Sequence, residues 1–425
     1  MNHMKIVFYE LKKALTSPII IFLTLLFAGY NIFLIYDQSY VREELTVANE
    51  LAKTYGVKIT DESLKKFEED LQKELVQLNA IAKKTTDKEF ASVYEFLDTL
   101  RMEDYERYSE EEWAFISRLQ LKEMYLYLAK NIDKDYAEIK AKWDSIAKAT
   151  IDQYQLSGDA AKTLQKEFDK FEQRLDEIIE TGEHKTWFFA GKPYMMHSFL
   201  FKTILKHLAI EALIIVVLAT AFVTNYEFEN RTHLVVYATK RGRNAIKDKL
   251  IASFVTAATV AAFLFAITLT TYFLVFDYSY LWTSSISSAL NWEFRMPYMA
   301  WWDLSFLSYL LLSILLIYAC LLLVSTLTFV ISIFLKNSYF TVILFAAFFI
   351  ICFMLTGFMP NSSVITLISE FNLLTLILNT HLFFMGNGEL IMFKYYEIMT
   401  VTAWTIIAVT LYFISWQSFK KQEIR

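Results

Sequence analysis

The sequence predicts an all-α integral membrane protein that crosses the bilayer with six helices. Hydrophobic residues make up 55% and aromatic residues 17% of the 425 residues, whereas ordinary soluble domains are about 45–50% apolar. The apolar residues gather in runs of membrane-spanning length, and the chain holds only 4 Pro and 9 Gly, so long helices are expected. Both cysteines, Cys320 and Cys352, fall in apolar runs, which indicates packing roles and no disulfide framework.

Six apolar runs are long enough to cross a bilayer as helices. They are expected at residues 18–36, 201–226, 250–276, 305–335, 339–360 and 396–416. The first run could instead be a signal peptide. It is longer than a typical signal-peptide core of about 7–15 residues, and no small-x-small cleavage site follows it, so we expect a retained span.

Basic residues mark every second loop. Lys and Arg near span ends are retained on the cytoplasmic side. They occur before the first span, after the second, after the fourth and after the sixth, at Lys5, Lys12, Lys13, Lys240, Arg241, Arg243, Lys247, Lys249, Lys336, Lys420, Lys421 and Arg425. Both termini, including the tail 417–425, are therefore expected in the cytoplasm, with the chain in a cell membrane such as a bacterial plasma membrane.

The block 37–200 is then extracellular and reads as a helical domain. Residues 37–198 hold 24 Lys and Arg against 34 Asp and Glu, whereas the rest of the chain holds 17 against 12. Ser109 with Glu112 forms a capping-box signature, and one apolar stripe recurs at spacings of three and four, at Leu64, Phe67, Leu71, Leu75, Leu78 and Ile81. The domain could be a receptor or exit vestibule for a substrate, or simply a solvated helical bundle.

Two further segments are expected on the outer side. The loop 277–304 carries tryptophans at positions typical of an interfacial belt, Trp282, Trp292, Trp301 and Trp302, and Trp187 precedes the second span on the same side. Residues 364–385 are apolar enough for a seventh span, but one more crossing would place the basic tail outside. We therefore expect residues 361–395 to form re-entrant or interfacial helices.

No catalytic motif occurs in the sequence. There is no G-x-x-x-x-G-K-[ST], H-E-x-x-H, C-x-x-C or G-x-S-x-G, and the six histidines are scattered over both sides of the membrane. Asp133 and Asp135 resemble the start of a calcium loop but lack the Gly and the later Glu that such a loop needs. We expect no catalytic residue, no metal site and no nucleic-acid partner.

The loop 227–249 is the most informative stretch. Two acids precede a threonine, a short apolar run and a basic end: Glu227, Glu229, Thr232, Leu234, Val235, Val236, Arg241, Arg243, Lys247 and Lys249. This order predicts a short amphipathic helix beneath the membrane, with acids at its N-terminal end, where the helix dipole favours them. The positive-inside rule alone could also supply the cations.

The order of these parts resembles the permease subunits of ABC-2 type exporters, in the branch with a large extracellular domain between the first two spans. In that family the corresponding loop forms the coupling helix that docks on the ATPase. Glu229, Thr232, Arg243 and Lys249 match the family pattern. Arg231 stands where Gly is usual, Lys240 where Pro is usual, and Asp248 where Gly is usual.

The resemblance extends to both sides of this loop. Residues 1–17 are similar to the family's interfacial elbow helix, and residues 361–395 to its re-entrant helices. It implies that Glu227, Glu229, Arg231, Thr232, Arg241, Arg243 and Lys249 couple the chain to an ATPase.

The implied function is that of a permease subunit. Such a subunit moves a hydrophobic or amphipathic substrate, such as an antimicrobial peptide, an antibiotic or a lipid, outward through the membrane lipid. It works with two copies of an ABC ATPase subunit, which hold ATP and Mg²⁺, and with a second permease that is identical or paralogous. An alternative is a mechanotransmission protein that signals through its extracellular domain without transport; a purely structural anchor would not explain the loop.

His207 and Glu211 are candidate substrate-path residues. They lie four residues apart near the outer end of the second span, and ionisable groups at membrane depth usually face protein or water along a pathway. We expect them to line the outer part of a substrate cavity. Snorkelling at the outer interface is the alternative.

Overall fold

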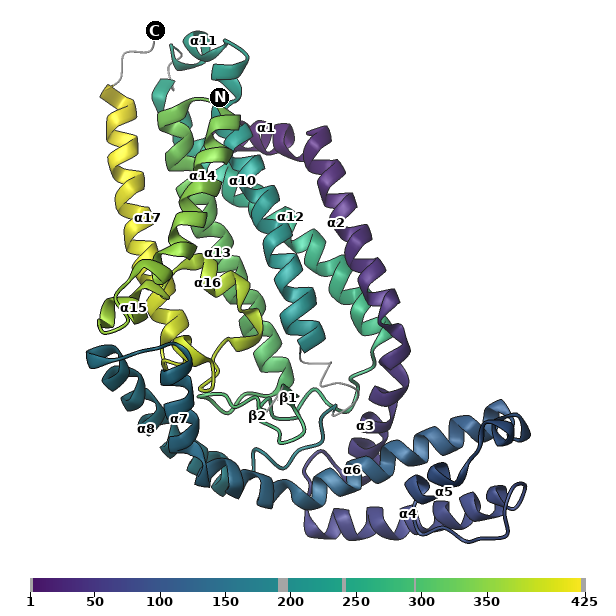
Figure 1. The fold of residues 1–425 in the computed structure, drawn as a ribbon. Coiled ribbons are helices and arrows are strands. Elements are labelled where there is room, and N and C mark those ends of the chain that lie inside the picture. Colours follow the sequence, from purple (N-terminus) through teal and green to yellow (C-terminus); the bar gives the residue numbers. More distant parts are fainter. Residues whose placement is uncertain (1–2, 190–197, 239–241, 294–295, 422–425) are drawn as a thin grey trace.

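The computed structural model describes residues 3–189, 198–238, 242–293 and 296–421 (Figure 1). Six helices in this part of the chain are long and apolar enough to cross a membrane. They are α2 (Pro18–Asp37), α10 (Leu205–Glu229), α12 (Ala245–Val275), α13 (Phe306–Leu335), α14 (Ser338–Met354) and α17 (Tyr396–Lys421). The described strands are two short ones, β1 (Trp292–Glu293) and β2 (Met296–Pro297), which pair antiparallel. The predicted all-α membrane class is confirmed at this level.

The spanning helices form a bundle around α10 and α13. These two helices are buried over most of their length, whereas α2, α14 and α17 expose most of their apolar side chains. α10 packs against α12 and α13, and α13 packs against α17. Thr220 and Ser325 share a hydrogen bond of 3.0 Å between α10 and α13, as small polar residues do where helices approach closely in lipid.

The two ends of the bundle differ in charge and content. α1 (His3–Leu15), α11 (His233–Tyr237) and the last turn of α17 lie together at one end, which we call the basic end (Figure 1). The helices of the acidic block lie at the opposite, acidic end. Both ends of the chain are therefore on the same side of the bundle, as an even number of crossings requires.

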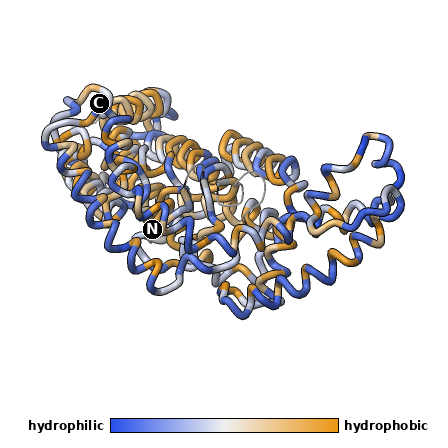
Figure 2. Tube along the Cα trace, turned by 60° about the horizontal axis from the view of Figure 1, so that its bottom comes forward, coloured by the Kyte–Doolittle hydropathy of each residue, from blue (hydrophilic) through white to orange (hydrophobic). Residues whose placement is uncertain are grey.

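The described part of the acidic block contains six α-helices: α3 (Arg42–Tyr55), α4 (Asp61–Ala82), α5 (Val93–Thr99), α6 (Glu110–Ala141), α7 (Trp143–Gln153) and α8 (Gly158–Thr181). α4 packs along α6, and α7 packs along α8. The predicted capping box is present, since Ser109 Oγ accepts from Glu112 N and Ser109 N donates to the Glu112 carboxylate. The hydropathy-coloured trace separates this largely hydrophilic lobe from the apolar spans (Figure 2).

Short helices replace the possible seventh span. Residues 361–395 contain α15 (Val364–Ser369), α16 (Leu373–Leu378) and the 3-10 turns Thr380–Leu382 and Glu389–Ile391. None of these is long enough to cross a bilayer. The α8 N-terminus docks on this segment, because Asp159 N donates to Ser362 O at 3.1 Å and Ser157 N donates to Asn361 O at 3.0 Å.

The expected tryptophan belt is wrong at two positions. Trp187 and Trp301 are 0% and 4% exposed, so neither can reach lipid headgroups. The reason is that the loop 277–304 packs under the acidic block, where Trp301 Nε1 donates to Met392 O at 2.7 Å and its ring meets Phe171 of α8 edge-on at 4.7 Å. The Trp301–Phe171 contact joins α8 of the acidic block to the loop 277–304, whereas Trp187 packs inside the block against Phe67 and Tyr125.

Candidate functional site

A buried pair of opposite charges lies where α10 ends and α12 begins. Glu227 is in the last turn of α10, Lys249 is in the second turn of α12, and both side chains are almost fully buried. The Lys249 ammonium donates hydrogen bonds to the Glu227 carboxylate and, at 2.6 Å, to the carbonyl oxygen of Val223. Pairing and hydrogen bonding stabilise both charges at this depth.

α1 joins the same pair. Lys13 Nζ donates to Glu227 Oε1 and to Glu10 Oε1, both at 2.9 Å, and it lies 4.4 Å from the centre of the Tyr226 ring. Two carboxylates thus hold two ammonium groups. This ionic cluster, made of Glu10, Lys13, Glu227 and Lys249, fastens α1 to α10 and α12 at the basic end.

A tight turn follows α10. Arg231 has a φ of +57°, the left-handed region that favours glycine. Thr232 N donates to Glu227 O at 2.8 Å, which closes the turn directly before α11. The position where the exporter pattern has Gly therefore has a backbone suited to Gly, although Arg occupies it here.

α11 presents an apolar pair beyond the end of the bundle. Leu234 and Val235 are 55% and 74% exposed, and Arg231 and Thr232 beside them are exposed as well. Figure 1 shows α11 at the end of the molecule farthest from the acidic block. The opposite face of α11 is buried through Tyr237.

Tyr237 connects α11 to the spanning helices. Its ring lies 5.7 Å from that of Phe228 at the end of α10 and 5.3 Å from that of Phe419 in α17. Ile246 of α12 and Phe329 of α13 complete a small apolar cluster around it. A displacement of α11 would therefore be transmitted to four of the spanning helices.

The predicted amphipathic helix over residues 227–249 is wrong in its extent. Glu227 and Glu229 end α10 instead of starting the next helix, α11 has five residues, and α12 already begins at Ala245. Acids at a helix C-terminus are disfavoured by the dipole, but here Lys249 and Lys13 compensate Glu227. Glu229 is exposed and accepts a hydrogen bond of 2.7 Å from Ser338 N at the start of α14.

The predicted coupling residues therefore divide into two groups. Glu227 and Lys249 lie inside the protein, where they can position α11 but cannot touch a partner. Glu229, Arg231 and Thr232 are exposed. Arg241 lies outside the described residues, and Arg243 lies in the 3-10 turn Gly242–Asn244.

His207 and Glu211 both face α2. Asn31 Nδ2 donates to Glu211 Oε2 at 2.7 Å, with both residues buried, and the Tyr30 and His207 ring centres are 5.6 Å apart. The two residues thus contribute a polar contact between the first and second spans. Their role in a substrate cavity stays a prediction.

A cavity of about 870 Å³ lies at the acidic end, between the acidic block and the loops at that end of the bundle. α6 and α7 supply one wall, and the β1–β2 hairpin, Lys202 and residues 381–389 supply the other. The wall from α6 carries Asp135, Glu138 and Lys142. The volume lies within the range of ligand pockets, about 300–1,000 Å³.

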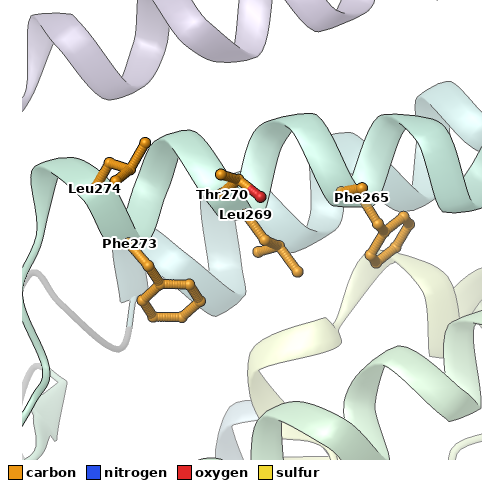
Figure 3. Close-up of a pocket in the computed structure, with 6 residues that line it drawn as sticks. Phe265, Leu269, Thr270, Phe273 and Leu274 are labelled. Atoms are coloured by element: carbon orange, nitrogen blue, oxygen red, sulfur yellow. The ribbon is translucent and has the colours of Figure 1, made fainter.

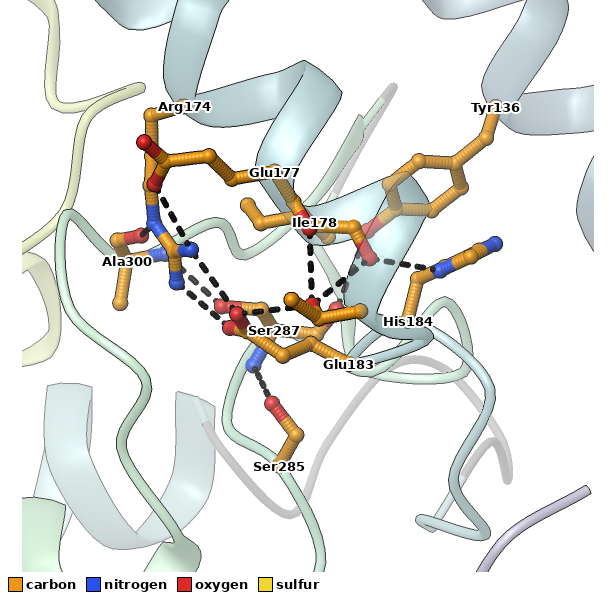
Figure 4. A network of polar contacts seen from close by, with 10 residues as sticks. Tyr136, Arg174, Glu177, Ile178, Glu183, His184, Ser285, Ser287 and Ala300 are labelled. Carbon is orange, nitrogen blue, oxygen red and sulfur yellow. Dashed lines mark hydrogen bonds and ion pairs between the residues drawn. The ribbon is translucent and has the colours of Figure 1, made fainter.

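A buried ion pair joins α8 to the segment that follows it (Figure 4). Arg174 of α8 makes two parallel hydrogen bonds with the Glu183 carboxylate, at 2.8 and 2.5 Å, and its Nε donates to Ala300 O at 3.2 Å. Tyr136 of α6 donates to Ser287 O at 3.0 Å. α6 and α8 are therefore both fixed to the loop 277–304.

A second, smaller cavity of about 420 Å³ lies along the membrane-embedded part of α12 (Figure 3). Phe265, Leu269, Phe273 and Leu274 line it, with Thr270 as the polar group. This apolar groove offers no charged group to select a ligand.

No protein-family model, curated protein or solved structure matches this chain. The interpretation of the site therefore depends on its own geometry. Sequence reasoning missed the cavity at the acidic end, because its walls come from segments as far apart as Asp135 and Glu389. Only the neighbouring acids of α6, Asp135 and Glu138, could have pointed to it, and one turn of helix with two acids is common on any solvated surface.

Proposed function

We propose that this chain is the membrane-spanning permease subunit of an ATP-binding cassette exporter that moves a hydrophobic or amphipathic substrate outward. A separate ATPase subunit, in two copies with ATP and Mg²⁺, would supply the energy, and a second permease, identical or paralogous, would complete the pathway. α11 is the observation that carries the proposal: it is exposed at its tip and packed at its base against α10, α12, α13 and α17.

The coupling would run through rigid contacts. Force applied to Leu234 and Val235 would pass through Tyr237 and the ionic cluster to α1, α10 and α12. Coupling between distant sites requires an element with two arrangements that both sites bias. The bundle would supply these arrangements by rocking between an inward-facing and an outward-facing state.

The first test is capture of the ATPase. The membrane-embedded chain carrying Val235→Asp should lose most of its co-purification with a P-loop ATPase encoded beside it, because a desolvated carboxylate opposes an apolar contact. Val76→Asp is the matched control, since Val76 on α4 is 70% exposed at the opposite end. Equal capture by both variants would show that α11 is not the docking surface.

Mechanotransmission is the second candidate, and the docking of α8 favours it. The α8 N-terminus is hydrogen-bonded to Asn361 and Ser362, shortly after α14 ends, so bundle motion would reach the acidic block directly. The two functions separate in reconstituted vesicles with the ATPase. Net movement of substrate supports export, whereas ATP-dependent changes confined to the acidic block, with no substrate movement, support transmission.

A further inference from the structure

The cavity at the acidic end is bounded by chemically different walls. α6 supplies two carboxylates one turn apart, Asp135 and Glu138, and Lys202 lies on the bundle side. Between them the lining includes the aromatic side chains of Phe168, Trp292 and Tyr298. A ligand that fills this space meets negative charge at one side and apolar or aromatic surface along its body.

Asp135 is the carboxylate best placed to receive a ligand. Among the described residues, no hydrogen bond or ion pair is made by its side chain, whereas Glu138 is paired with Lys142 Nζ at 3.2 Å. Glu389, which also lines the cavity, accepts a hydrogen bond from the Tyr154 hydroxyl. Asp135 is also only partly exposed, so its charge is less well solvated than that of a surface acid.

The pKa of Asp135 agrees with this description. Burial raises the pKa of this carboxyl above its usual value, and the neighbouring Glu138 carboxylate raises it further. An arriving cation would relieve both effects, since it replaces lost solvent and screens the repulsion between the two acids. The whole block 37–198, with its ten-charge excess of acids, would attract cations toward the same end.

We infer that this cavity binds a small cationic amphipathic molecule, with its ammonium or guanidinium group at Asp135 and Glu138 and its apolar body against Trp292 and Tyr298. The inference adds a ligand class to the proposed export function. It rests on that function only for the statement that the bound molecule is the one transported. Binding itself requires no ATPase.

The test uses the full chain, without ATPase, in nanodiscs of zwitterionic lipid. Rhodamine 6G, a cationic aromatic dye, is the probe; fluorescein is its anionic counterpart, and empty nanodiscs correct for partition into lipid. Fluorescence anisotropy should show saturable binding of rhodamine 6G that weakens as salt increases. Saturable binding of fluorescein with equal affinity would overturn the inference.

Three variants locate the site. Asp135→Asn combined with Glu138→Gln should weaken dye binding about tenfold, because charge-assisted contacts are lost. Lys142→Gln should tighten binding, since it removes a competing cation. Asp144→Asn removes one negative charge at an exposed position of α7 outside the cavity and should leave binding unchanged.

The opposite direction expected for Lys142→Gln separates a site effect from misfolding, since unfolding weakens binding in every variant. Equal weakening by the cavity pair and by Asp144→Asn would refute the site. Dye binding with the expected pattern, together with failed ATPase capture, would retain the cavity and reject the exporter. ATPase capture without dye binding would support the exporter and reject the cavity as a binding site.

Discussion

At the scale of single residues, Arg231 departs from local preference, as one of five non-glycine residues with a positive φ in the described part of the chain. A residue with a side chain in the left-handed region costs about 1–2 kcal/mol relative to its normal conformation, a cost that Gly avoids. Strain of this kind is informative at a functional site. In the proposed function, its place beside Leu234 and Val235 would put the guanidinium in contact with the ATPase.

The substitution Arg231→Gly should therefore have two opposite effects. We expect it to raise the free energy of unfolding of the isolated chain by about 1 kcal/mol and to reduce ATPase capture several-fold. Thermal unfolding in detergent and co-purification measure the two effects. Gln155→Gly is the matched control, because Gln155 is exposed with a φ of +52° at the acidic end; it should stabilise without changing capture. Undiminished capture with Arg231→Gly would exclude a docking role for Arg231.

Gly386 lies at a position where a side chain would clash with a neighbouring residue. A Cβ at this position would lie 1.7 Å from Phe171 Cε2, and Phe171 is fully buried between Trp143 and Trp301. We expect Gly386→Ala to destabilise the protein by about 1–3 kcal/mol, the usual cost of overpacking.

Thermal unfolding followed by tryptophan fluorescence measures this cost. Phe171→Leu in the same chain should recover part of it, because the smaller side chain vacates the clash. Gly357→Ala is the control, since a Cβ there meets nothing within 4 Å. A neutral Gly386→Ala would mean that the loop 381–389 shifts away from α8 without cost.

At the scale of elements, α8 depends on one buried ion pair. Arg174→Met leaves the Glu183 carboxylate buried without its partner, and we expect a loss of about 3–5 kcal/mol. The double variant Arg174→Met/Glu183→Leu should recover most of that loss, because apolar replacements of a buried pair are close to neutral.

Hydrogen exchange of the loop 277–304 localises the effect, since Arg174 also donates to Ala300 O. We expect faster exchange in that loop for the single variant than for the double variant. Glu177→Leu is the control, because Glu177 is largely exposed and lies 3.4 Å from Arg174. Equal losses in the single and double variants would show that the pair itself is strongly stabilising.

His184 predicts how this junction responds to pH. The ring is buried, with Nδ1 3.0 Å from Ile178 O, and burial lowers the pKa of His184 below its ordinary value of about 6.5, against the opposing effect of Asp133. The folded state then binds a proton less readily than the unfolded state. The contribution of the neutral His184 ring to the stability of the fold is complete above about pH 6.5 and is lost as pH falls below that value. His184→Gln should flatten the dependence of thermal stability on pH between about pH 7 and 5. An unchanged slope would mean that other titratable groups cause the pH dependence.

The sequence predicted elements well and their contacts poorly. All six spanning helices and the Ser109 cap follow from apolar length and local capping, which are properties of short segments. The burial of Trp187 and Trp301, and the pairing of Glu227 with Lys249, depend on which segments meet in space. A charged residue near a span end has the same local signature whether it snorkels, docks a partner or pairs inside, so the loop 227–249 could be located but not resolved.

At the scale of the whole molecule, the helix bundle has two chemically different ends. The basic end carries α11 and the ionic cluster, and the acidic end carries the cavity and the block fastened over it. This polarity makes sense of the proposed function only if the basic end faces the cytoplasm, where ATP is available. The positive-inside rule predicts that orientation from Lys5, Lys12 and Lys13 onward.

Cysteine labelling tests the orientation directly. Cys320→Ala and Cys352→Ala provide a cysteine-free chain, into which Met102→Cys at the acidic end and Val235→Cys at the basic end are introduced singly; Met102 and Val235 are both strongly exposed. A membrane-impermeant maleimide added to intact cells should label the Met102→Cys chain at once. The Val235→Cys chain should be labelled only after permeabilisation.

Lys420→Cys, on the last turn of α17, should behave like Val235→Cys, because six crossings bring both ends of the chain to one side. The reverse labelling pattern would mean that the basic end faces outward, where α11 could not reach a cytoplasmic ATPase. Labelling of the Lys420→Cys chain in intact cells together with the Met102→Cys chain would mean an odd number of crossings.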